Sequence, residues 1–210
     1  MNRDAISIHL AVQFAWTVYK KRYGLFLAIL LTLFGAWIVL EIAVIAGQPL
    51  GILWWIAAHL AFFVVFAGLK AGLLRICLAL YDGIDPTFTD VFKYLKQGPI
   101  FFAGQLVYLL IVAVGLIFLV IPGLYLAARY ALFGFCLIDS DTTNRARSFQ
   151  QSATLSTSIK MSLMLILIGL ILFNVLGAAL LGLGLLVTLP VSSLIMAAIY
   201  RQASDLKVIS

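Results

Sequence analysis

The chain has 210 residues, of which 64% are hydrophobic and only 10% are charged, and its mean hydropathy is +1.15. A water-soluble domain of this length could not bury so much apolar surface, whereas a lipid bilayer accepts helices that satisfy their own backbone hydrogen bonds. The composition therefore predicts a single polytopic membrane domain over residues 1–210. It excludes a separate soluble lobe, because no polar stretch is long enough to fold alone.

The formal net charge is +6 at pH 7, but its distribution argues against a nucleic-acid partner. Nucleic-acid patches are dense basic runs, and the chain contains none. Its basic residues instead flank long apolar runs, which is typical of residues that set membrane topology. The expected surroundings are the lipid bilayer and other membrane protein subunits.

Residues 4–22 precede the first long apolar run. Hydrophobic residues alternate with more polar ones there, and that period of two alone would predict a strand. A single strand at a membrane surface would leave backbone groups unpaired. We therefore expect an interfacial amphipathic helix, with Trp16 and Tyr19 at the depth of the lipid headgroups.

The first pair of spans is expected on either side of a short turn at residues 47–51. Span one covers residues 23–46. Span two begins near Gly51 and is longer than a simple crossing, so we expect it to extend beyond the bilayer with Lys70 reaching the interface. Gly68 and Gly72 form a GxxxG motif, which permits close approach of another helix but is a weak signal alone.

The second unit opens with an amphipathic segment over residues 85–97. Pro86 suits the first turn of a helix, and a neighbouring threonine can cap it. Apolar residues recur at helical spacing while the charged residues face away. The apolar set is Phe88, Val91, Phe92 and Leu95.

Gly98-Pro99 ends this surface helix and starts span three, which is expected to run to Ile121. Pro122-Gly123 then turns the chain. Span four is short and is expected to end near Ile138.

The third unit follows the polar loop at residues 139–144. Residues 145–160 are rich in serine and threonine and predict a third interfacial helix, with Phe149, Ala153 and Ile159 available for its membrane-facing side. Spans five and six are expected over residues 161–181 and 185–200, joined by a turn at Gly182-Leu183-Gly184. Pro190 removes a backbone donor inside span six, so a kink is expected there.

The chain thus divides into three similar units, at approximately 4–81, 85–138 and 143–203. Each has a surface helix, a basic residue, a small residue and then a helical hairpin. Duplication of one hairpin unit explains the pattern, although helical periodicity alone could mimic it. The predicted fold class is all-α integral membrane, with six transmembrane helices arranged as three hairpins, each preceded by an interfacial amphipathic helix.

The distribution of lysine and arginine predicts the orientation. The three short turns contain neither residue, whereas the N-terminus, the two long loops and the C-terminus hold nearly all of them. Positive charge stays on the cytoplasmic side during insertion. We therefore expect a multi-pass protein of the bacterial plasma membrane with both termini in the cytoplasm.

Two charged residues are expected at depth in the membrane, Glu41 in span one and Arg129 in span four. An isolated charge there costs at least about 2.5 kcal/mol, so a partner is expected. We predict that they form a buried ion pair that fixes span one against span four. The alternatives are a functional site for an anionic headgroup or substrate, and no contact at all.

Two neutral polar residues also lie within predicted spans. His59 could in principle ligate a cofactor, but a single histidine without a partner motif is better interpreted as a satisfied interior residue. Asn174 is interpreted as an interhelical hydrogen-bonding residue rather than a transport site. The aspartates of the loops are interpreted as caps and turn residues, and no metal site or cofactor is expected.

The residues laid out above resemble those of one protein family. The chain is similar to bacterial six-span membrane proteins of the YciC type, which are related to the membrane domain fused to some glycerophosphodiester phosphodiesterases. The matching stretches are 16–23, Tyr81-Asp82-Gly83 with Pro86, 88–92, Ile121-Pro122-Gly123 with Arg129-Tyr130, Ser152 before Lys160, Gly184, 187–190 and Tyr200. The resemblance covers nearly the whole chain and implies fold and topology. It implies no activity, and this chain lacks a phosphodiesterase domain.

No Ser-His-Asp, HExxH or P-loop spacing is present, so no enzymatic reaction is expected. The first functional hypothesis is a non-enzymatic inner-membrane protein that acts through helix and lipid contacts, as an accessory subunit or envelope-homeostasis factor. The alternative is a small-molecule or lipid transporter or exporter, which the hairpins and the polar groups at depth would favour. A membrane enzyme acting on lipid is the least favoured.

Overall fold

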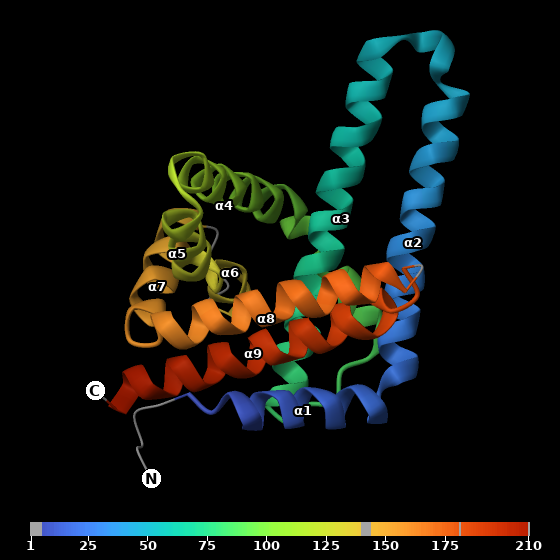
Figure 1. The fold of residues 1–210 in the computed structure, drawn as a ribbon. Coiled ribbons are helices and arrows are strands. Elements are labelled where there is room, and N and C mark those ends of the chain that lie inside the picture. The colour runs from blue at the N-terminus through green and yellow to red at the C-terminus, as the bar shows by residue number, and fades with distance from the viewer. Residues whose placement is uncertain (1–5, 140–143, 181, 210) are drawn as a thin grey trace.

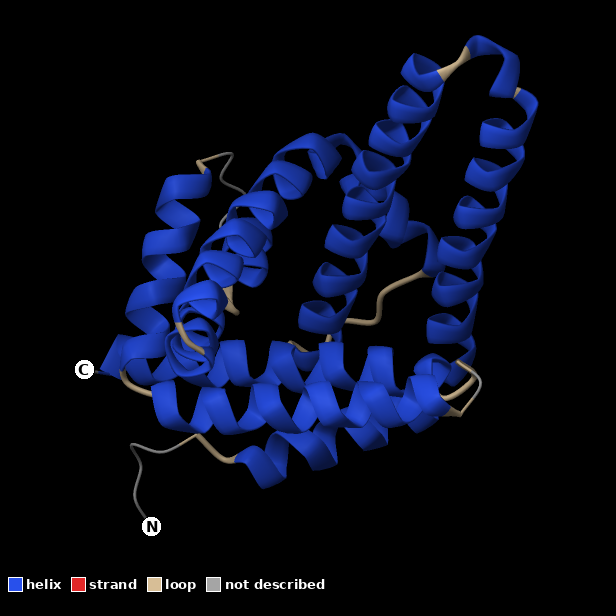
Figure 2. Cartoon of the chain, turned by 45° about the horizontal axis from the view of Figure 1, so that its top comes forward, coloured by secondary structure: helices blue, strands red, loops and turns tan. Residues whose placement is uncertain are grey.

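The computed structural model describes residues 6–139, 144–180 and 182–209, and within these ranges every regular element is a helix (Figures 1 and 2). The elements are α1 Ile8–Lys21, α2 Tyr23–Ala46, η1 Gln48–Leu50, α3 Ile52–Tyr81, η2 Phe88–Gln97, α4 Gly98–Phe118, α5 Val120–Tyr130, α6 Phe133–Asp139, α7 Arg145–Thr157, α8 Lys160–Ala179 and α9 Leu185–Ile209. The described chain contains six segments long and apolar enough to cross a membrane. The all-α class and the six segments able to span a membrane are therefore confirmed.

Helices α2 and α3 lie side by side and extend away from the other helices (Figure 1). The 3-10 turn η1 joins them, and Gly51 takes a left-handed φ of 75° that favours glycine. At this end the indole Nε1 of Trp54 donates a hydrogen bond to the carbonyl of Ala43 at 3.0 Å. The flanking residues are open, with Leu53 77% exposed. Lipid or another membrane helix can cover such a surface favourably.

Helices α8 and α9 lie side by side and run across α3 rather than along it (Figures 1 and 2). A threonine and two glycines let them approach closely, since a Cβ on Gly177 would lie 2.5 Å from Oγ1 of Thr188 and a Cβ on Gly184 would lie 2.6 Å from Cα of Gly177. Pro190 lies inside α9, which continues on both sides of it. The six candidate spans therefore do not share one direction.

Helix α1 lies antiparallel along α9. The backbone N–H of Ser7 donates to Oε1 of Gln202 at 3.0 Å, and Tyr19 Oη donates to the carbonyl of Leu186 at 3.4 Å. Ala11 and Ala15 are fully buried in the contact. The helix predicted within residues 4–22 is confirmed over α1, whereas residues 4 and 5 lie outside the described residues.

The break between α4 and α5 occurs at Leu119, whose extended backbone (φ −169°, ψ 152°) separates the two helices. The predicted turn at Pro122-Gly123 is therefore wrong by three residues. Both residues lie within the first turn of α5, where proline is tolerated because its missing N–H would lack an intrahelical partner. Gly123 instead permits close packing, since a Cβ there would lie 2.8 Å from the backbone nitrogen of Leu116.

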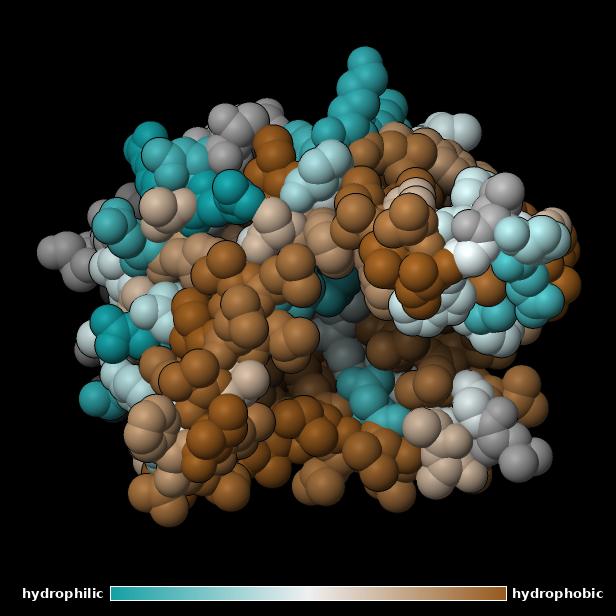
Figure 3. All heavy atoms as spheres, turned by 90° about the horizontal axis from the view of Figure 1, so that it is seen from above, coloured by the Kyte–Doolittle hydropathy of each residue, from teal (hydrophilic) through white to brown (hydrophobic). Residues whose placement is uncertain are grey.

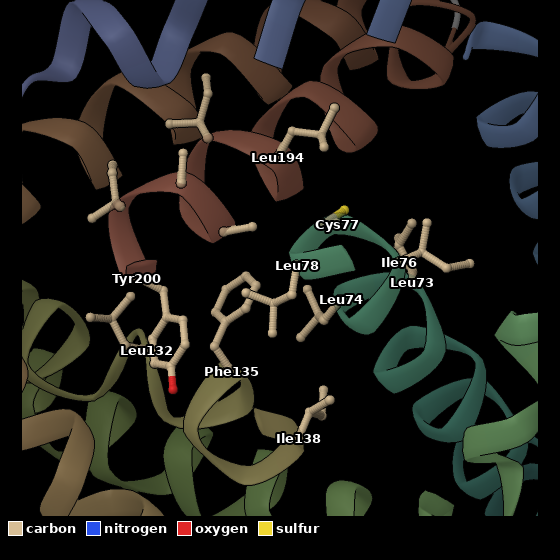
Figure 4. Close-up of a cluster of buried hydrophobic side chains, with 14 of the residues drawn as sticks. Leu73, Leu74, Ile76, Cys77, Leu78, Leu132, Phe135, Ile138, Leu194 and Tyr200 are labelled. Atoms are coloured by element: carbon tan, nitrogen blue, oxygen red, sulfur yellow. The ribbon is translucent and has the colours of Figure 1, made fainter. Parts of the chain in front are cut away.

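The core is built from α3, α6 and α9, whose apolar side chains point toward one another (Figure 4). Span four is divided into α5 and α6, and the seven-residue α6 is buried from Phe133 to Ile138. The ring of Tyr200 stacks on Phe135, with centroids 5.6 Å apart. The buried half of α3, residues 67–78, therefore differs sharply from its exposed half near Trp54.

The GxxxG pair of α3 receives η2. A Cβ on Gly72 would lie 2.1 Å from the backbone oxygen of Val91, and a Cβ on Gly68 would lie 2.9 Å from Cα of Leu95. The two glycines therefore allow close packing of η2, rather than of another long helix, against α3. This segment is a 3-10 helix, not the α-helix that its spacing indicates. Its start is capped as expected near Thr87, whose backbone N–H donates to Asp90 Oδ2 at 2.8 Å.

The three residues expected to face the membrane from the third surface helix pack against the protein instead; Phe149 and Ala153 lie on α7, and Ile159 follows it. The ring of Phe149 stacks on Phe133 with centroids 4.7 Å apart, Ala153 is half-buried and Ile159 is only 5% exposed. The predicted membrane-facing side is therefore wrong. The cause is a buried serine face, on which Ser152 Oγ donates to the carbonyl of Arg129 at 3.2 Å.

Candidate functional site

The predicted ion pair between Glu41 and Arg129 does not form. No ion pair within the described ranges joins these two residues. Arg129 is exposed, and its Nη1 donates to Tyr125 Oη one turn earlier at 3.4 Å. The guanidinium also lies 5.9 Å from the ring centroid of Tyr130, within the range of a cation–π contact. The local aromatic residues thus replace the expected carboxylate.

Because the two residues form no pair, we expect their coupling energy to be near zero. In a double-mutant cycle with Glu41→Gln and Arg129→Met, the effects on the free energy of unfolding should add within about 0.5 kcal/mol. Denaturant titration in detergent measures them. A coupling above about 1 kcal/mol would mean that the two side chains meet in the membrane.

The two neutral polar candidates make different contacts. His59 is partly buried on α3, with Nδ1 2.8 Å from the carbonyl of Trp55 and its ring 4.1 Å from the Trp55 ring. Asn174 Nδ2 donates both to the carbonyl of Leu170 on its own helix at 2.8 Å and to Oγ of Ser192 on α9 at 2.9 Å. Among the described residues, no group of three or more His, Cys, Asp or Glu side chains could hold a metal ion.

An ion-pair cluster joins the ends of α3, α6 and α9. Asp139, the last residue of α6, accepts hydrogen bonds from Arg201 Nη1 at 2.7 Å, Tyr200 Oη at 2.9 Å and Arg75 Nη1 at 3.5 Å. Arg201 also binds Asp82 through two hydrogen bonds of 2.8 and 2.5 Å. Two aspartates and two arginines thus compensate one another. We call these four residues and Tyr200 the base cluster.

The base cluster is a structural site. Arg201 is only 19% exposed and Asp139 only 23%, so each charge depends on its partners rather than on water. The planar guanidinium of Arg201 matches two carboxylates at once, which a lysine could not do. Interpretation of the loop aspartates as ordinary caps missed this cluster. The signal that could have found it is an aspartate at the end of each of two apolar segments, Asp82 and Asp139.

A polar cavity of about 240 Å³ lies among α3, α4, α6 and α9. Its polar side chains come from elements far apart in the sequence. They are Lys70 on α3, Gln105 and Tyr108 on α4, and Ser192 and Ser193 on α9. Apolar residues complete the wall, notably Phe101, Phe133 and Met196. From above, hydrophilic residues are visible at the bottom of a central hollow rimmed by hydrophobic residues (Figure 3).

Of the described residues that line this cavity, Lys70 is the only cation. Its Nζ donates to Oε1 of Gln105 at 3.2 Å, and no ion pair of Lys70 with a carboxylate occurs in the part of the chain that the structure describes. Lys70 lies in the candidate span 52–81 and lines this cavity, and its expected reach to the interface stays a prediction. An uncompensated cation at this depth is a functional-site candidate by default.

A second cavity, of about 470 Å³, is apolar and open. Its walls are Ile8, Val12 and Trp16 of α1 and several aliphatic residues of α8 and α9. Gly169 faces open space there, since a Cβ would meet no atom within 4 Å. In a bilayer such a groove accepts hydrocarbon without any specific recognition.

The described residues form an all-helical chain with six candidate membrane spans and a cavity lined by Lys70. No family model, curated protein or solved structure matches the chain.

Proposed function

We propose that this chain is a non-enzymatic integral membrane protein of the bacterial plasma membrane that acts through helix and lipid contacts, as an accessory subunit or envelope-homeostasis factor. The observation that carries the proposal is the open apolar surface of α2 and α3. In the candidate spans 23–46 and 52–81, only 11% and 17% of the residues in the most apolar 18-residue stretch are buried within the chain. Lipid or a neighbouring membrane helix must cover the remainder.

Copurification tests the accessory role. The tagged protein, extracted in a mild detergent, should bring down the same protein or lipid species in independent preparations, as measured by mass spectrometry of both fractions. A second six-span membrane protein with the same tag and expression level serves as the control. Recovery of no species beyond those in the control would overturn the proposal.

The proposed topology has six spans, with both termini in the cytoplasm and three hairpins. It is supported by six sufficiently long segments and by short turns that lack basic residues. Because α8 and α9 run across α3, the hairpins can cross together only if they tilt. Helix α3 has 30 residues. Its length is about 45 Å, against a hydrocarbon core of about 30 Å, so it exceeds the core and can tilt.

Reporter fusions test this topology. A reporter that is active only in the cytoplasm should be active when fused after Ser210, because the flanking basic residues hold that end inside. The same reporter inserted between Gln48 and Gly51 should be inactive. Activity at both positions, or at the second alone, would contradict the orientation.

We further propose kinship with the six-span proteins of the YciC type. The support is the shared set of short motifs together with an all-helical chain that has six candidate spans. Tyr81-Asp82 and Tyr200, which belong to that resemblance, lie at or beside the base cluster here. A structural constraint can explain two of these motifs, since Asp82 binds Arg201 of α9 and Tyr200 binds Asp139 of α6.

Transport is the second candidate function, and the cavity at Lys70 favours it. The cavity reaches Ser192, which accepts the hydrogen bond of Asn174, whereas Arg129 does not line it. Proteoliposomes loaded with labelled inorganic phosphate would test it, with Lys70→Met as the comparison. Flux through the wild type that Lys70→Met abolishes supports transport, and equal leakage from both removes this candidate.

A further inference from the structure

The Lys70 cavity offers hydrogen-bond donors without acceptors of opposite charge. The ammonium of Lys70 has three hydrogens and uses one of them on Gln105. The amide nitrogen of Gln105 makes no hydrogen bond in the described structure. Ser192 Oγ accepts from Asn174, so its own hydroxyl hydrogen is available. These donors come from α3, α4 and α9 and line the same cavity.

The charges around the Lys70 cavity favour an anionic ligand. Among the described residues, no aspartate or glutamate lines the cavity, and the acidic residues nearest along α3 and α6, Asp82 and Asp139, are bound in the base cluster. A neutral ligand would leave the ammonium of Lys70 uncompensated in a low-dielectric site. An anion would compensate it and accept hydrogen bonds from all three groups.

The size and walls of the cavity restrict the anion further. Its volume of about 240 Å³ lies below the range of roughly 300–1,000 Å³ typical of sites for drug-sized ligands. The site therefore holds a headgroup-sized anion and leaves any acyl chains outside. A phosphate group presents its oxygens on a tetrahedron and can accept from donors on three helices, whereas a carboxylate presents its acceptor sites in one plane.

We propose that the cavity at Lys70 binds a phosphate group, carried by an anionic phospholipid or present as free phosphate, with Lys70 as its charge partner and Gln105 and Ser192 as hydrogen-bond donors. The proposal deepens the lipid contacts proposed above and rests on the membrane location of the chain. It does not depend on whether a protein partner exists, so copurification without a partner would leave it intact.

The test is thermal unfolding of the full chain in a neutral detergent, with three added probes. Dioleoyl phosphatidic acid supplies a lipid phosphate, dioleoylglycerol supplies the same acyl chains without it, and inorganic phosphate supplies the free ion. A ligand that binds only the folded protein raises Tm in a saturable way. We expect phosphatidic acid or inorganic phosphate to raise the Tm of the wild type and dioleoylglycerol to leave it unchanged.

Lys70→Met should weaken binding by about tenfold to a hundredfold, the value of one charge-assisted hydrogen bond. Methionine is apolar and of similar length, so the variant should fold, and its Tm without probe verifies this. Lys96→Met removes an exposed lysine with the same change in net charge and should bind as the wild type does. Lys70→Arg should retain binding because it keeps the cation.

The probes also separate the two sources of phosphate. A response to phosphatidic acid alone assigns a lipid headgroup, a response to inorganic phosphate alone assigns the free ion, and a response to both assigns the phosphate group itself. Equal responses of the wild type and Lys70→Met, or no response of the wild type to either phosphate probe, would overturn the proposal.

Discussion

Replacement of Arg201 by methionine is expected to lower the free energy of unfolding by about 3 kcal/mol. Among the described residues, the variant would leave Asp82 without a cation and Asp139 with Tyr200 and the longer contact to Arg75. Removal of one partner from a buried ion pair costs about 3–5 kcal/mol, and the partial exposure of this cluster places the effect at the lower end. Denaturant titration in detergent measures the change.

The matched control is Arg22→Met. Arg22 pairs with Asp85 at 2.7 Å, but the two side chains are 46% and 64% exposed. Exposed ion pairs contribute about 0–1 kcal/mol, so this variant should be nearly neutral although it removes the same charge. Equal losses in the two variants would show that net charge, rather than the base cluster, governs stability.

Replacement of Gly72 by alanine is expected to lower the free energy of unfolding by about 2 kcal/mol. The added Cβ would lie 2.1 Å from the backbone oxygen of Val91, which cannot move unless η2 moves with it. Overpacking of this kind costs about 1–3 kcal/mol, which exceeds the gain of up to about 1 kcal/mol from replacing a helical glycine with alanine. Detachment of η2 should also raise hydrogen exchange in residues 88–97.

Gly35→Ala provides the control for Gly72→Ala. Gly35 lies inside α2, and a Cβ there would meet no atom within 4 Å. The same substitution should therefore be neutral or stabilising by up to about 1 kcal/mol. If both alanine variants were equally stable, the close approach between α3 and η2 would be incorrect.

The helices could be predicted where the signal is local. The apolar run of span one gives α2 the bounds Tyr23–Ala46 that its length predicts, and α8 begins within one residue of the expected Met161. The break at Leu119 could not be predicted, because Pro122-Gly123 is the stronger local turn signal and proline is also acceptable in the first turn of a helix. Side-chain direction in α7 depends on α5 and α6, which no local pattern contains.

The candidate site was less predictable than the fold. The predicted Glu41–Arg129 pair relied on similar depth in two spans, but depth does not determine which helices are neighbours. Lys70 was expected to reach the interface because its side chain is long and flexible. Only the fold shows that α4 and α9 place Gln105 and Ser192 around it. Polar groups from three distant segments have no joint signature in one sequence.

Asp139 of α6 accepts hydrogen bonds from Arg75 of α3 and Arg201 of α9, so it fixes the three helices to one another at one point. If α3 rotates as a rigid rod about Arg75, displacement grows with distance along the rod. Lys70 lies five residues from that pivot and Trp54 lies twenty-one residues from it, on the same side. A movement of about 1 Å at Lys70 would therefore become one of about 4 Å at Trp54, given a constant rise per residue. A small movement of α3 near Lys70 would thus become a larger movement at Trp54, where α2 and α3 expose apolar side chains.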